Sequence, residues 1–346
     1  MSDEIRANEG GSPADAAQQN HTTTNDELND IVVGVDGTNE SFCALKWALT
    51  LAGKTGQQVN AVFGWSHSWD ISSDSEPESD EAWKQTRKEI ADTLREWVDQ
   101  ATEGIDFDPE NLKLTSVKAS GSTALLQMGQ HAQQIVVGRR TIGRVARWFL
   151  GSLSSSLAEG AMVPVTVVRP DGDEPVSSVQ ENIAEALKPD KQSMKTVTAD
   201  KILGDEHLLP VVVGIDGSKG SRHALDFAID AAAVDGRPLH VLFCWQMKDL
   251  GQLPGYETTV PSVAEGQRHA EQVAQEAVAS ANIPDNVEVQ THAFHIQAGK
   301  GLISASRYAH QLVVGSRGLS GLDARFLGSV SKQVVDSAEC TVTVVH

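Results

Sequence analysis

The stretch Gln311-Leu-Val-Val-Gly315-Ser-Arg-Gly318, followed after nine residues by Gly328-Ser329, decides how this chain is read. Its first residues form a short apolar run that predicts a strand, and residues 329–336 have a helical pattern. A strand therefore leads into a glycine-rich loop, and the loop leads into a helix. Because glycine permits close approach and positive φ, such a loop can present bare backbone N–H groups to phosphate. Similar loops also occur without a ligand, so the loop alone leaves both interpretations open.

The chain repeats this pattern once. Ile31-Val-Val-Gly-Val-Asp36 matches Val211-Val-Val-Gly-Ile-Asp216, and the strand that ends at Gly138 matches the one that ends at Gly315. These matches continue along residues 30–170 and 210–346, which we interpret as two copies of one domain. Each copy has a normal length for a single hydrophobic core. Residues 1–29 form a polar, acidic tail that predicts disorder, and residues 171–209 form a linker.

Short β-branched runs alternate with helical stretches in both copies. The strands are continuously apolar, which indicates a parallel sheet buried on both faces. The predicted fold class is therefore α/β, with two tandem doubly wound domains, each a five-stranded parallel sheet with flanking helices. In the second copy we expect strands near 210–216, 239–245, 287–293, 311–315 and 341–345, and helices near 219–234, 261–281, 299–308 and 328–338.

Composition and charge exclude several classes of function. The net charge is −19 with a pI near 4.9, which disfavours broad binding to nucleic acid or to anionic membranes. No apolar run approaches the roughly 18 residues that a membrane span needs, and the N-terminal stretch has no signal-peptide pattern. The three cysteines, Cys43, Cys244 and Cys340, show no CxxC spacing. They predict free thiols in a reducing compartment, and hence a cytoplasmic protein.

Chemistry-bearing residues fall at the ends of two predicted strands. Asp36 and Asp216 end the first strand of each copy, and Gly138 and Gly315 end the fourth. Ligands of doubly wound folds bind beyond the C-terminal strand ends at the switch point, so one pocket per copy would collect both features. An aspartate before Gly-Ser or Gly-Thr can also serve only to cap the next helix, and position alone leaves these two roles open.

Taken together, these residues resemble the universal stress protein family in its tandem form, which has an adenine nucleotide alpha-hydrolase-like fold. The resemblance covers both copies. ATP-binding members of that family carry Gly, two residues, Gly, nine residues, Gly, and then Ser or Thr. The second copy matches this motif in full with Gly315, Gly318, Gly328 and Ser329. The loop and Asp216 at the end of the first strand are specific in combination, although either alone would be weak.

The resemblance implies a role for each matching residue. Asp216 would contact ribose or adenine, and the backbone near Cys244 would hold the adenine edge. The glycine loop with Ser329 would wrap the triphosphate of ATP, which usually brings Mg²⁺ with it. We add Arg317 as a phosphate contact because of its charge and its place inside the loop.

The first copy departs from the motif. It reads Gly138, then Thr141 where the second glycine belongs, then Gly151-Ser152. A β-branched residue is unfavourable where the backbone needs positive φ or direct phosphate contact. Four arginines crowd the same loop and offer phosphate binding by side chain, or simply a solvated basic loop: Arg139, Arg140, Arg144 and Arg147. The first copy is therefore predicted to be an altered site.

Two functions from different classes follow. The first is an ATP-binding stress-response or signalling module, with the second domain as the competent site and an unidentified protein partner. The alternative is a nucleotide-independent scaffold that works by dimerisation. No clear general base or metal-ligand set is present, so slow ATP hydrolysis is the most that we expect. The nearly identical strands 165–168 and 342–345 are predicted sheet edges, and we expect them to pair as an intramolecular pseudo-dimer, with a homodimer as a further step.

Several aromatic residues allow two interpretations. Trp65 and Trp245 follow the second strand of each copy, where they either pack at the sheet edge or form a wall of the adenine pocket. Packing is the preferred interpretation. His292 and His295 are three residues apart, and packing histidines are favoured there over a metal-binding pair.

Overall fold

The computed structural model describes residues 30–65, 80–105, 107–139, 152–169, 208–246, 262–318 and 327–346. The expected tail at 1–29 and nearly all of the expected linker at 171–209 lie outside the described residues. The middle parts of the two glycine loops, 140–151 and 319–326, also lie outside them.

The first repeat contains five strands and four helices among its described residues. They are β1 (Ile31–Gly34), α1 (Asn39–Thr55), β2 (Val59–Trp65), α2 (Asp80–Thr102), β3 (Leu112–Lys118), α3 (Gly121–Met128), β4 (Gln134–Gly138), α4 (Ser152–Gly160) and β5 (Val165–Val168). One turn of 3-10 helix (Pro109–Asn111) precedes β3.

The second repeat has the same order of elements. They are β6 (Val211–Ile215), α6 (Lys219–Asp235), β7 (Leu239–Cys244), α7 (Val263–Ala279), β8 (Val289–Phe294), α8 (Ala298–Ala305), β9 (Gln311–Gly315), α9 (Ser329–Ser337) and β10 (Thr341–Val345). Every strand and helix predicted for this repeat is present, with ends that differ by a few residues at most.

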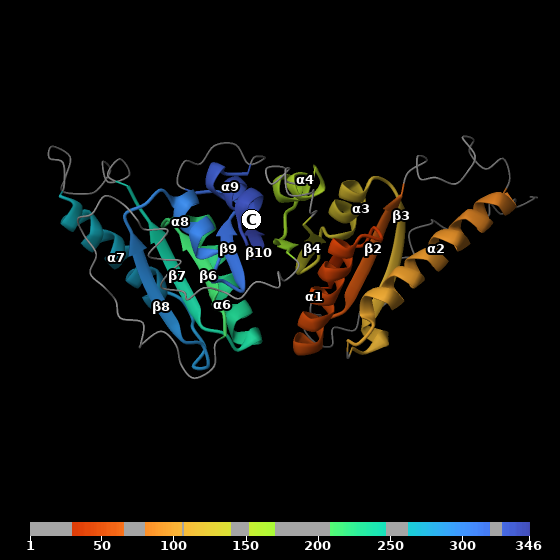
Figure 1. The fold of residues 1–346 in the computed structure, drawn as a ribbon, viewed down its shortest axis with the longest axis horizontal. Coiled ribbons are helices and arrows are strands. Elements are labelled where there is room, and N and C mark those ends of the chain that lie inside the picture. The colour runs from red at the N-terminus through yellow and green to blue at the C-terminus, as the bar shows by residue number, and fades with distance from the viewer. Residues whose placement is uncertain are drawn as a thin grey trace, which may run out of the picture.

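The strands form one continuous sheet in the order β3-β2-β1-β4-β5-β10-β9-β6-β7-β8 (Figure 1). Within each repeat the five strands are parallel, which confirms the predicted α/β class with two doubly wound units. The two halves join through β5 and β10, which pair antiparallel with Thr166 opposite Thr343. Because the join is antiparallel, the C-terminal strand ends of the two repeats lie at opposite edges of the sheet.

Alternating side chains of each strand enter different hydrophobic cores. In β1, Val33 packs with α1 and α2 on one face of the sheet, and Val32 packs on the other face with α3. The core on the α3 face continues across the junction into the second repeat, where Leu302 of α8 and Val334 of α9 belong to it. The core on the α1 face is separate from its counterpart beneath α6. The two halves therefore share the core on the α3 face, whereas their cores on the opposite face of the sheet are separate.

A chain of buried polar side chains crosses the junction. The hydroxyls of Thr166 and Thr343 are 2.8 Å apart, and Thr166 donates to Oε1 of Gln134 over 2.7 Å. On the other side, Nε2 of Gln311 donates to the Thr343 hydroxyl over 2.6 Å. All four side chains are buried. Since a buried polar group left without a partner costs about 1–3 kcal/mol, this chain favours one register of the two edge strands.

The first helix of each repeat begins and ends for the same local reasons. The side chains of Thr38 and Ser218 accept the N–H groups of residues three positions later and cap α1 and α6. Gly56 and Gly236 end these helices with φ of 74° and 61°, a left-handed conformation that glycine adopts without strain.

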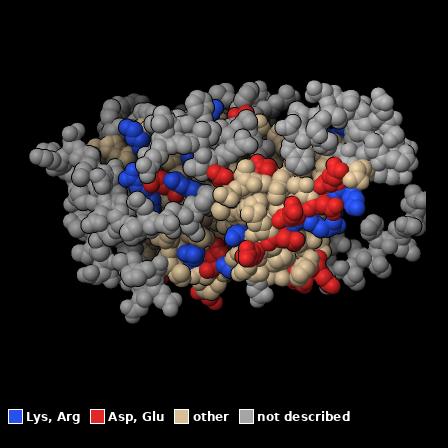
Figure 2. Space-filling model, turned by 45° about the vertical axis from the view of Figure 1, so that its right-hand side comes forward, with Lys and Arg blue, Asp and Glu red and all other residues tan. Residues whose placement is uncertain are grey.

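The outer helix of the first repeat presents a charged face to solvent. Figure 2 shows a band of acidic and basic side chains on this part of the surface. The exposed side chains of α2 include Lys88, Glu89, Asp92, Arg95, Glu96 and Asp99. Arg95 and Asp92 form an ion pair of 3.0 Å. Across the described ranges, no helix is both long and apolar enough to cross a bilayer.

Candidate functional site

Asp216 and Gly318 lie against each other at the C-terminal edge of the second repeat. Asp216 follows the last residue of β6, and its Oδ1 accepts the N–H of Ser218 over 2.9 Å. Its other carboxylate oxygen lies so close to Gly318 that a Cβ there would collide with it. Two residues that the sequence assigns to one site are thus neighbours, and a side chain at position 318 would require the Asp216 carboxylate to move.

Gly315 ends β9 against the first turn of α6. A Cβ on Gly315 would lie 2.8 Å from the carbonyl group of Gly220, and a Cβ on Gly220 would lie 2.9 Å from the carbonyl oxygen of Arg317. The loop after β9 therefore packs on α6, and only glycine at both positions allows this approach. Sequence reasoning missed Gly220. A comparison of the two repeats could have identified it, because the first repeat has Glu40, and not glycine, at the equivalent position.

The helix that follows the loop begins without a side-chain cap. Gly328 is the N-cap of α9, and Ser329 is the first helical residue. The Gly328 N–H donates to the carbonyl of Ser316 over 2.8 Å, and the Ser331 hydroxyl donates to the carbonyl of Gly315 over 2.6 Å. The first N–H groups of a helix have no intrahelical acceptor, and they form its positive end. Within the described residues no side chain caps this end of α9. Ser331, which sequence reasoning missed, ties it to β9.

Other helices of the chain show the contrast. Side chains cap the N-termini of α1, α3, α6 and α7, through Thr38, Ser120, Ser218 and Ser262. Among the described helices whose N-cap is also described, α8 and α9 have no such hydrogen bond. Of these two, α9 is the one that follows the glycine loop, so its N-terminus is the better site for a phosphate.

Cys244 is the last residue of β7, next to the end of β6. The register pairs Phe243 with Ile215, so Cys244 and Asp216 occupy the next position of the two strands. The Cys244 thiol lies over Gly301, where a Cβ would come within 2.6 Å of the sulfur. Burial raises the pKa of this thiol to about 12, so it stays protonated near neutral pH. None of the three cysteines forms a disulfide, as predicted.

Arg317 lies half-buried between the two glycines of the loop, and its positive charge acts on the last residue of the chain. Burial first, and then Arg317, lowers the pKa of His346 to about 4. The guanidinium therefore lies near His346. The expected contact of Arg317 with phosphate stays a prediction.

The first repeat has a different arrangement at the same edge. Asp36 is exposed, and its Oδ1 accepts both the N–H of Thr38 over 3.1 Å and its hydroxyl over 2.6 Å, as a turn-forming carboxylate does. Gly138 approaches the carbonyl of Glu40 too closely for any Cβ. Gly151 lies outside the described residues, as do Thr141, Arg140, Arg144 and Arg147, and Ser152 is described only as the start of α4.

Arg139 does not lie free for a phosphate. Its guanidinium donates to the carbonyls of Ala338 and Asp336, at the C-terminal end of α9. Phosphate binding by this arginine stays a prediction, and the contact across the junction is one that sequence reasoning did not foresee.

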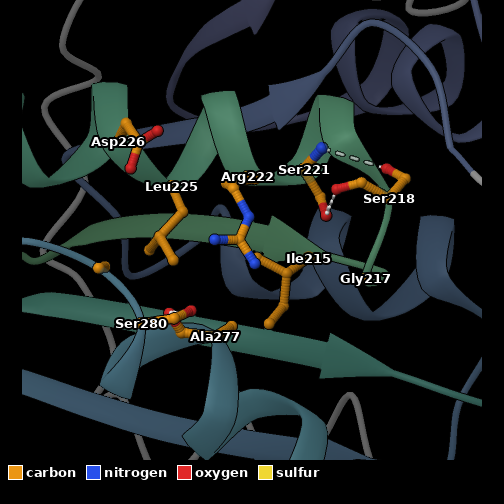
Figure 3. Close-up of a pocket in the computed structure, with 10 residues that line it drawn as sticks. Ile215, Gly217, Ser218, Ser221, Arg222, Leu225, Asp226, Ala277 and Ser280 are labelled. Atoms are coloured by element: carbon orange, nitrogen blue, oxygen red, sulfur yellow. Dashed lines mark hydrogen bonds between the residues drawn. The ribbon is translucent and has the colours of Figure 1, made fainter.

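A small pocket lies between α6 and α7, next to the end of β6 (Figure 3). Its volume is about 50 Å³, and its lining includes Gly217, Arg222 and Ala277. In the first repeat the ring of Trp97 covers the equivalent glycine, Gly37, where a Cβ would lie 2.7 Å from ring atoms. Trp97 and Ala277 stand 180 positions apart, as Gly37 and Gly217 do. The pocket thus marks a place where the second repeat lacks an indole ring that the first one has.

Two histidines share the core under α8. His240 of β7 is 3% exposed, and its ring centroid lies 4.9 Å from that of His292 on β8. The Nδ1 of His240 and the Nε2 of His292 are buried without a hydrogen-bond partner among the described residues. Burial, with His292 as a second cause, lowers the pKa of His240 to about 3, so both rings are neutral at pH 7. Within the described ranges, no group of three or more His, Cys, Asp or Glu side chains is placed to bind a metal.

The aromatic residue after β7 is a packing residue. Trp245 is 1% exposed, and its Nε1 donates to Gln267 over 3.0 Å. His295 stacks on it with ring centroids 4.3 Å apart, and so does not pair with His292. These contacts support packing over a role as a wall of a ligand pocket.

Comparison with known proteins agrees with this architecture. The model of the universal stress protein family matches residues 27–169 and again 208–346. A universal stress protein of Mycolicibacterium smegmatis is 31% identical over 330 residues, which are 91% of this chain and 96% of that protein. One of Mycobacterium tuberculosis (strain H37Rv) is 29% identical over 322 residues, 91% of this chain and 96% of its own length.

A solved structure gives the same result for the fold. A universal stress protein from Archaeoglobus fulgidus superposes with a TM-score of 0.55 at 17% identity and covers 92% of this chain and 96% of its own. Another universal stress protein, determined in complex with cAMP, is 28% identical, with a TM-score of 0.27, and covers 40% of this chain and 96% of its own. Since the family model matches both repeats, the chain belongs to the universal stress protein family and carries two of its domains in tandem.

Proposed function

We propose that the chain is an ATP-binding universal stress protein that acts as a nucleotide-dependent module in stress response or signalling. Its second domain is the competent site, and its first domain is altered. The observation that carries the proposal is the uncapped N-terminus of α9, which follows the glycine loop beside Asp216. A triphosphate with four charges suits such a site because free N–H groups and the helix dipole both favour an anion.

Each site residue has a role in this proposal. Asp216 accepts hydrogen bonds from ribose, and the backbone at Cys244, on the neighbouring strand, meets the adenine edge. The triphosphate, with or without Mg²⁺, lies along a loop and helix start that include Gly315, Gly318, Gly328 and Ser329, with Arg317 as a further cation. In the first domain Asp36, Gly138, Gly151 and Ser152 occupy the corresponding positions.

The module binds nucleotide and does little chemistry on it. We expect slow hydrolysis at most, because the sequence shows no clear set of general base and metal ligands. The domains extend over 30–170 and 210–346 with a linker between them, in a cytoplasmic protein whose three unpaired thiols suit a reducing compartment. The partner that reads the nucleotide state is a protein.

A nucleotide-independent scaffold is the second candidate. The observation that favours it is the continuous sheet, in which β5 and β10 pair as the two halves of a pseudo-dimer would. In that case the shared junction is the functional core of the protein, and a homodimer of whole chains extends it.

Nucleotide binding is tested on the full chain. We expect released adenine nucleotide from denatured protein, and one ATP per chain by calorimetry after stripping. Gly318→Thr copies Thr141 of the first domain and should weaken ATP binding more than about tenfold, because its Cβ meets the Asp216 carboxylate. Gly236→Asn is the matched control. Its φ of 61° suits asparagine, and no atom lies within 4 Å of its Cβ position.

Three results would count against the proposal. Stripped protein that takes up no ATP supports the scaffold instead. Unchanged affinity in Gly318→Thr contradicts the proposed site, and so does an equal loss in the Gly236→Asn control.

A further inference from the structure

Helix α9 is held at its two ends by different domains. Its N-terminus is tied to its own domain by the bond from Ser331 to the carbonyl of Gly315. Its C-terminus is held by the first domain, where Nη1 of Arg139 donates to the carbonyl of Ala338 over 2.5 Å and Nη2 donates to that of Asp336. Nη1 of Arg169 also donates to the Ala338 carbonyl, over 2.9 Å. We call Arg139 and Arg169 the arginine clamp.

The clamp has a clear chemical basis. The last carbonyls of a helix lack intrahelical donors and form its negative end, which two guanidinium groups satisfy. Bringing two cations together is unfavourable, and Arg139 is also half-buried. Burial, and then Arg169, lowers the pKa of Arg139, while the nearby Asp336 carboxylate raises it. The clamp is therefore an arrangement that depends on α9 for its stability.

The second domain has no arginine at the two positions equivalent to those of the clamp. Ser316 stands 177 positions after Arg139, and His346 stands 177 positions after Arg169. Neither side chain carries a guanidinium group. The arginine contacts are therefore not reciprocal. The first domain, with the altered loop, supplies both arginines, and they bind the helix that follows the intact loop of the second domain.

The length of α9 makes its anchors important. It has nine residues, and isolated helices shorter than about 12–15 residues are marginal in water. Its orientation and the position of its first N–H groups therefore depend on the contacts at its ends and on its packed face. A group that fixes the C-terminal end also fixes the donors about 13 Å away at the other end.

We propose that Arg139 and Arg169 are positioning residues for the nucleotide site of the second domain, and that they couple nucleotide binding to the domain junction. The first domain then serves as the regulatory half, whose arginines hold α9 in the orientation that binds phosphate. By linkage, bound nucleotide strengthens the clamp by the same factor by which the clamp strengthens nucleotide binding. This inference rests on the proposed ATP site.

The test uses the full chain and ATP itself. Arg139→Ser and Arg169→His place at each position the residue of the other repeat, and each should weaken ATP binding threefold to tenfold in calorimetry. Arg139→Lys keeps the charge but loses the fork of two donors, so its affinity should lie between those of wild type and Arg139→Ser. Arg237→Ser is the matched control, because this arginine of the second domain also donates to a backbone carbonyl, that of Leu209 over 2.9 Å.

A second readout separates coupling from general loosening. In wild type, ATP should slow hydrogen exchange of the amides in β5 and β10 as well as those in the first turn of α9. In Arg139→Ser, ATP should protect α9 alone. Wild-type affinity in all three clamp variants, or an equal loss in Arg237→Ser, overturns the inference while the proposed ATP site stands. A wild-type chain that binds no ATP overturns both.

Discussion

The two domains have the same order of strands and helices, and they differ beside the end of their first strand. In the first domain Trp97 lies over Gly37, and the Phe42 ring is buried in the same core. In the second domain the equivalent positions carry Ala277 and Arg222, and a pocket opens between α6 and α7 (Figure 3). The two domains thus share their order of elements, and different side chains leave one region filled in the first domain and open in the second. Likewise, the second domain carries the full glycine motif, and the first carries the arginine clamp.

Exchanging these residues should give the largest effect. Trp97→Ala removes a ring that packs on Gly37 and meets Phe63 edge to face at 5.1 Å. We expect the first domain to lose about 3 kcal/mol of stability, the lower end of the range for truncating a large aromatic side chain. Urea denaturation, with hydrogen exchange of the β1 and β2 amides to assign the loss to the first domain, measures it.

The reverse exchange is its control. Ala277→Trp should cost the second domain much less, because the pocket has room beside Gly217, where no atom lies within 4 Å of a Cβ. Equal losses in the two variants would mean that the pocket is not the counterpart of the Trp97 site.

The second-largest effect should be a loss of stability of the second domain at low pH. His240 and His292 lie where the first domain has Asn60 and Thr115, a neutral pair with a hydrogen bond of 2.7 Å. The folded pKa of His240 is about 3, below the unfolded value of 6.5, so the folded state binds fewer protons. Stability is therefore complete above about pH 6.5 and is lost as the pH falls toward 3, by about 2 kcal/mol at pH 5.

Hydrogen exchange at pH 7 and pH 5 would measure this loss in β7 and compare it with β2. His240→Asn with His292→Thr copies the first domain and should reduce the difference between the two pH values. The remaining difference should come from His346, whose pKa is lowered to about 4. A second domain that is as stable at pH 5 as at pH 7 would show that the rings accept protons without cost.

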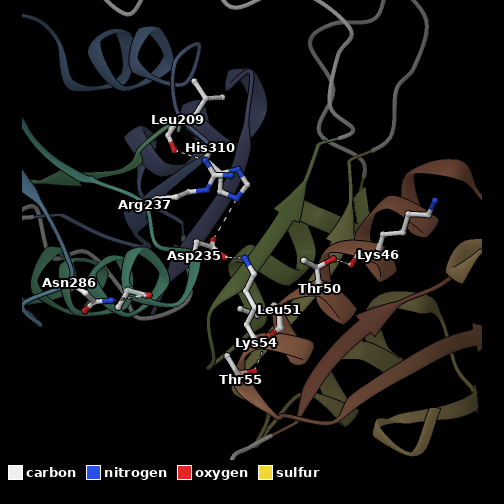
Figure 4. A network of polar contacts seen from close by, with 11 residues as sticks. Lys46, Thr50, Leu51, Lys54, Thr55, Leu209, Asp235, Arg237, Asn286 and His310 are labelled. Carbon is white, nitrogen blue, oxygen red and sulfur yellow. Dashed lines mark hydrogen bonds and ion pairs between the residues drawn. The ribbon is translucent and has the colours of Figure 1, made fainter. Parts of the chain in front are cut away.

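The smallest effect should come from the ion pair between the domains (Figure 4). Lys54 of α1 meets Asp235 at the end of α6 over 2.7 Å, and His310 lies 3.6 Å from the same carboxylate. The lysine side chain is 42% exposed, so Lys54→Met should cost less than about 1 kcal/mol, and less still at high salt. A loss of several kcal/mol in about 0.5 M salt, where the screening length is only about 4 Å, would contradict this view of the junction.

The fold follows from local signals that the repeat presents twice. Apolar runs such as Val211-Val-Val mark buried strands, and the caps at Ser218 and Gly236 mark the ends of α6. For this reason all the elements predicted for the second repeat are found. The nearness of Asp216 to the glycine loop also follows, because the ends of neighbouring parallel strands meet at one edge.

Contacts between distant side chains could not be predicted in the same way. Arg139 binds carbonyls almost 200 residues away, and nothing in its own loop distinguishes it from a phosphate-binding arginine. Nothing in the sequence around Trp97 indicates that its ring covers Gly37. His292 of β8 lies against His240 of the neighbouring strand β7. Strand register decides this contact, and closeness in sequence to His295 does not. Such contacts depend on how elements pack, which the pattern of one element does not contain.

The hydrogen-bond chain at the junction has a consequence for symmetry. Its four members are the same two residue types in each half, glutamine and threonine, yet they cannot act identically. Thr166 gives its only proton to Gln134, so Thr343 must give its own to Thr166, while Gln311 contributes its amide nitrogen. The chain therefore has a polarity, and reversing it requires both glutamine amides to flip together with both hydroxyls. Even if every residue of the two domains were identical, the centre of this sheet would still choose one direction, and the chain would be asymmetric at its axis.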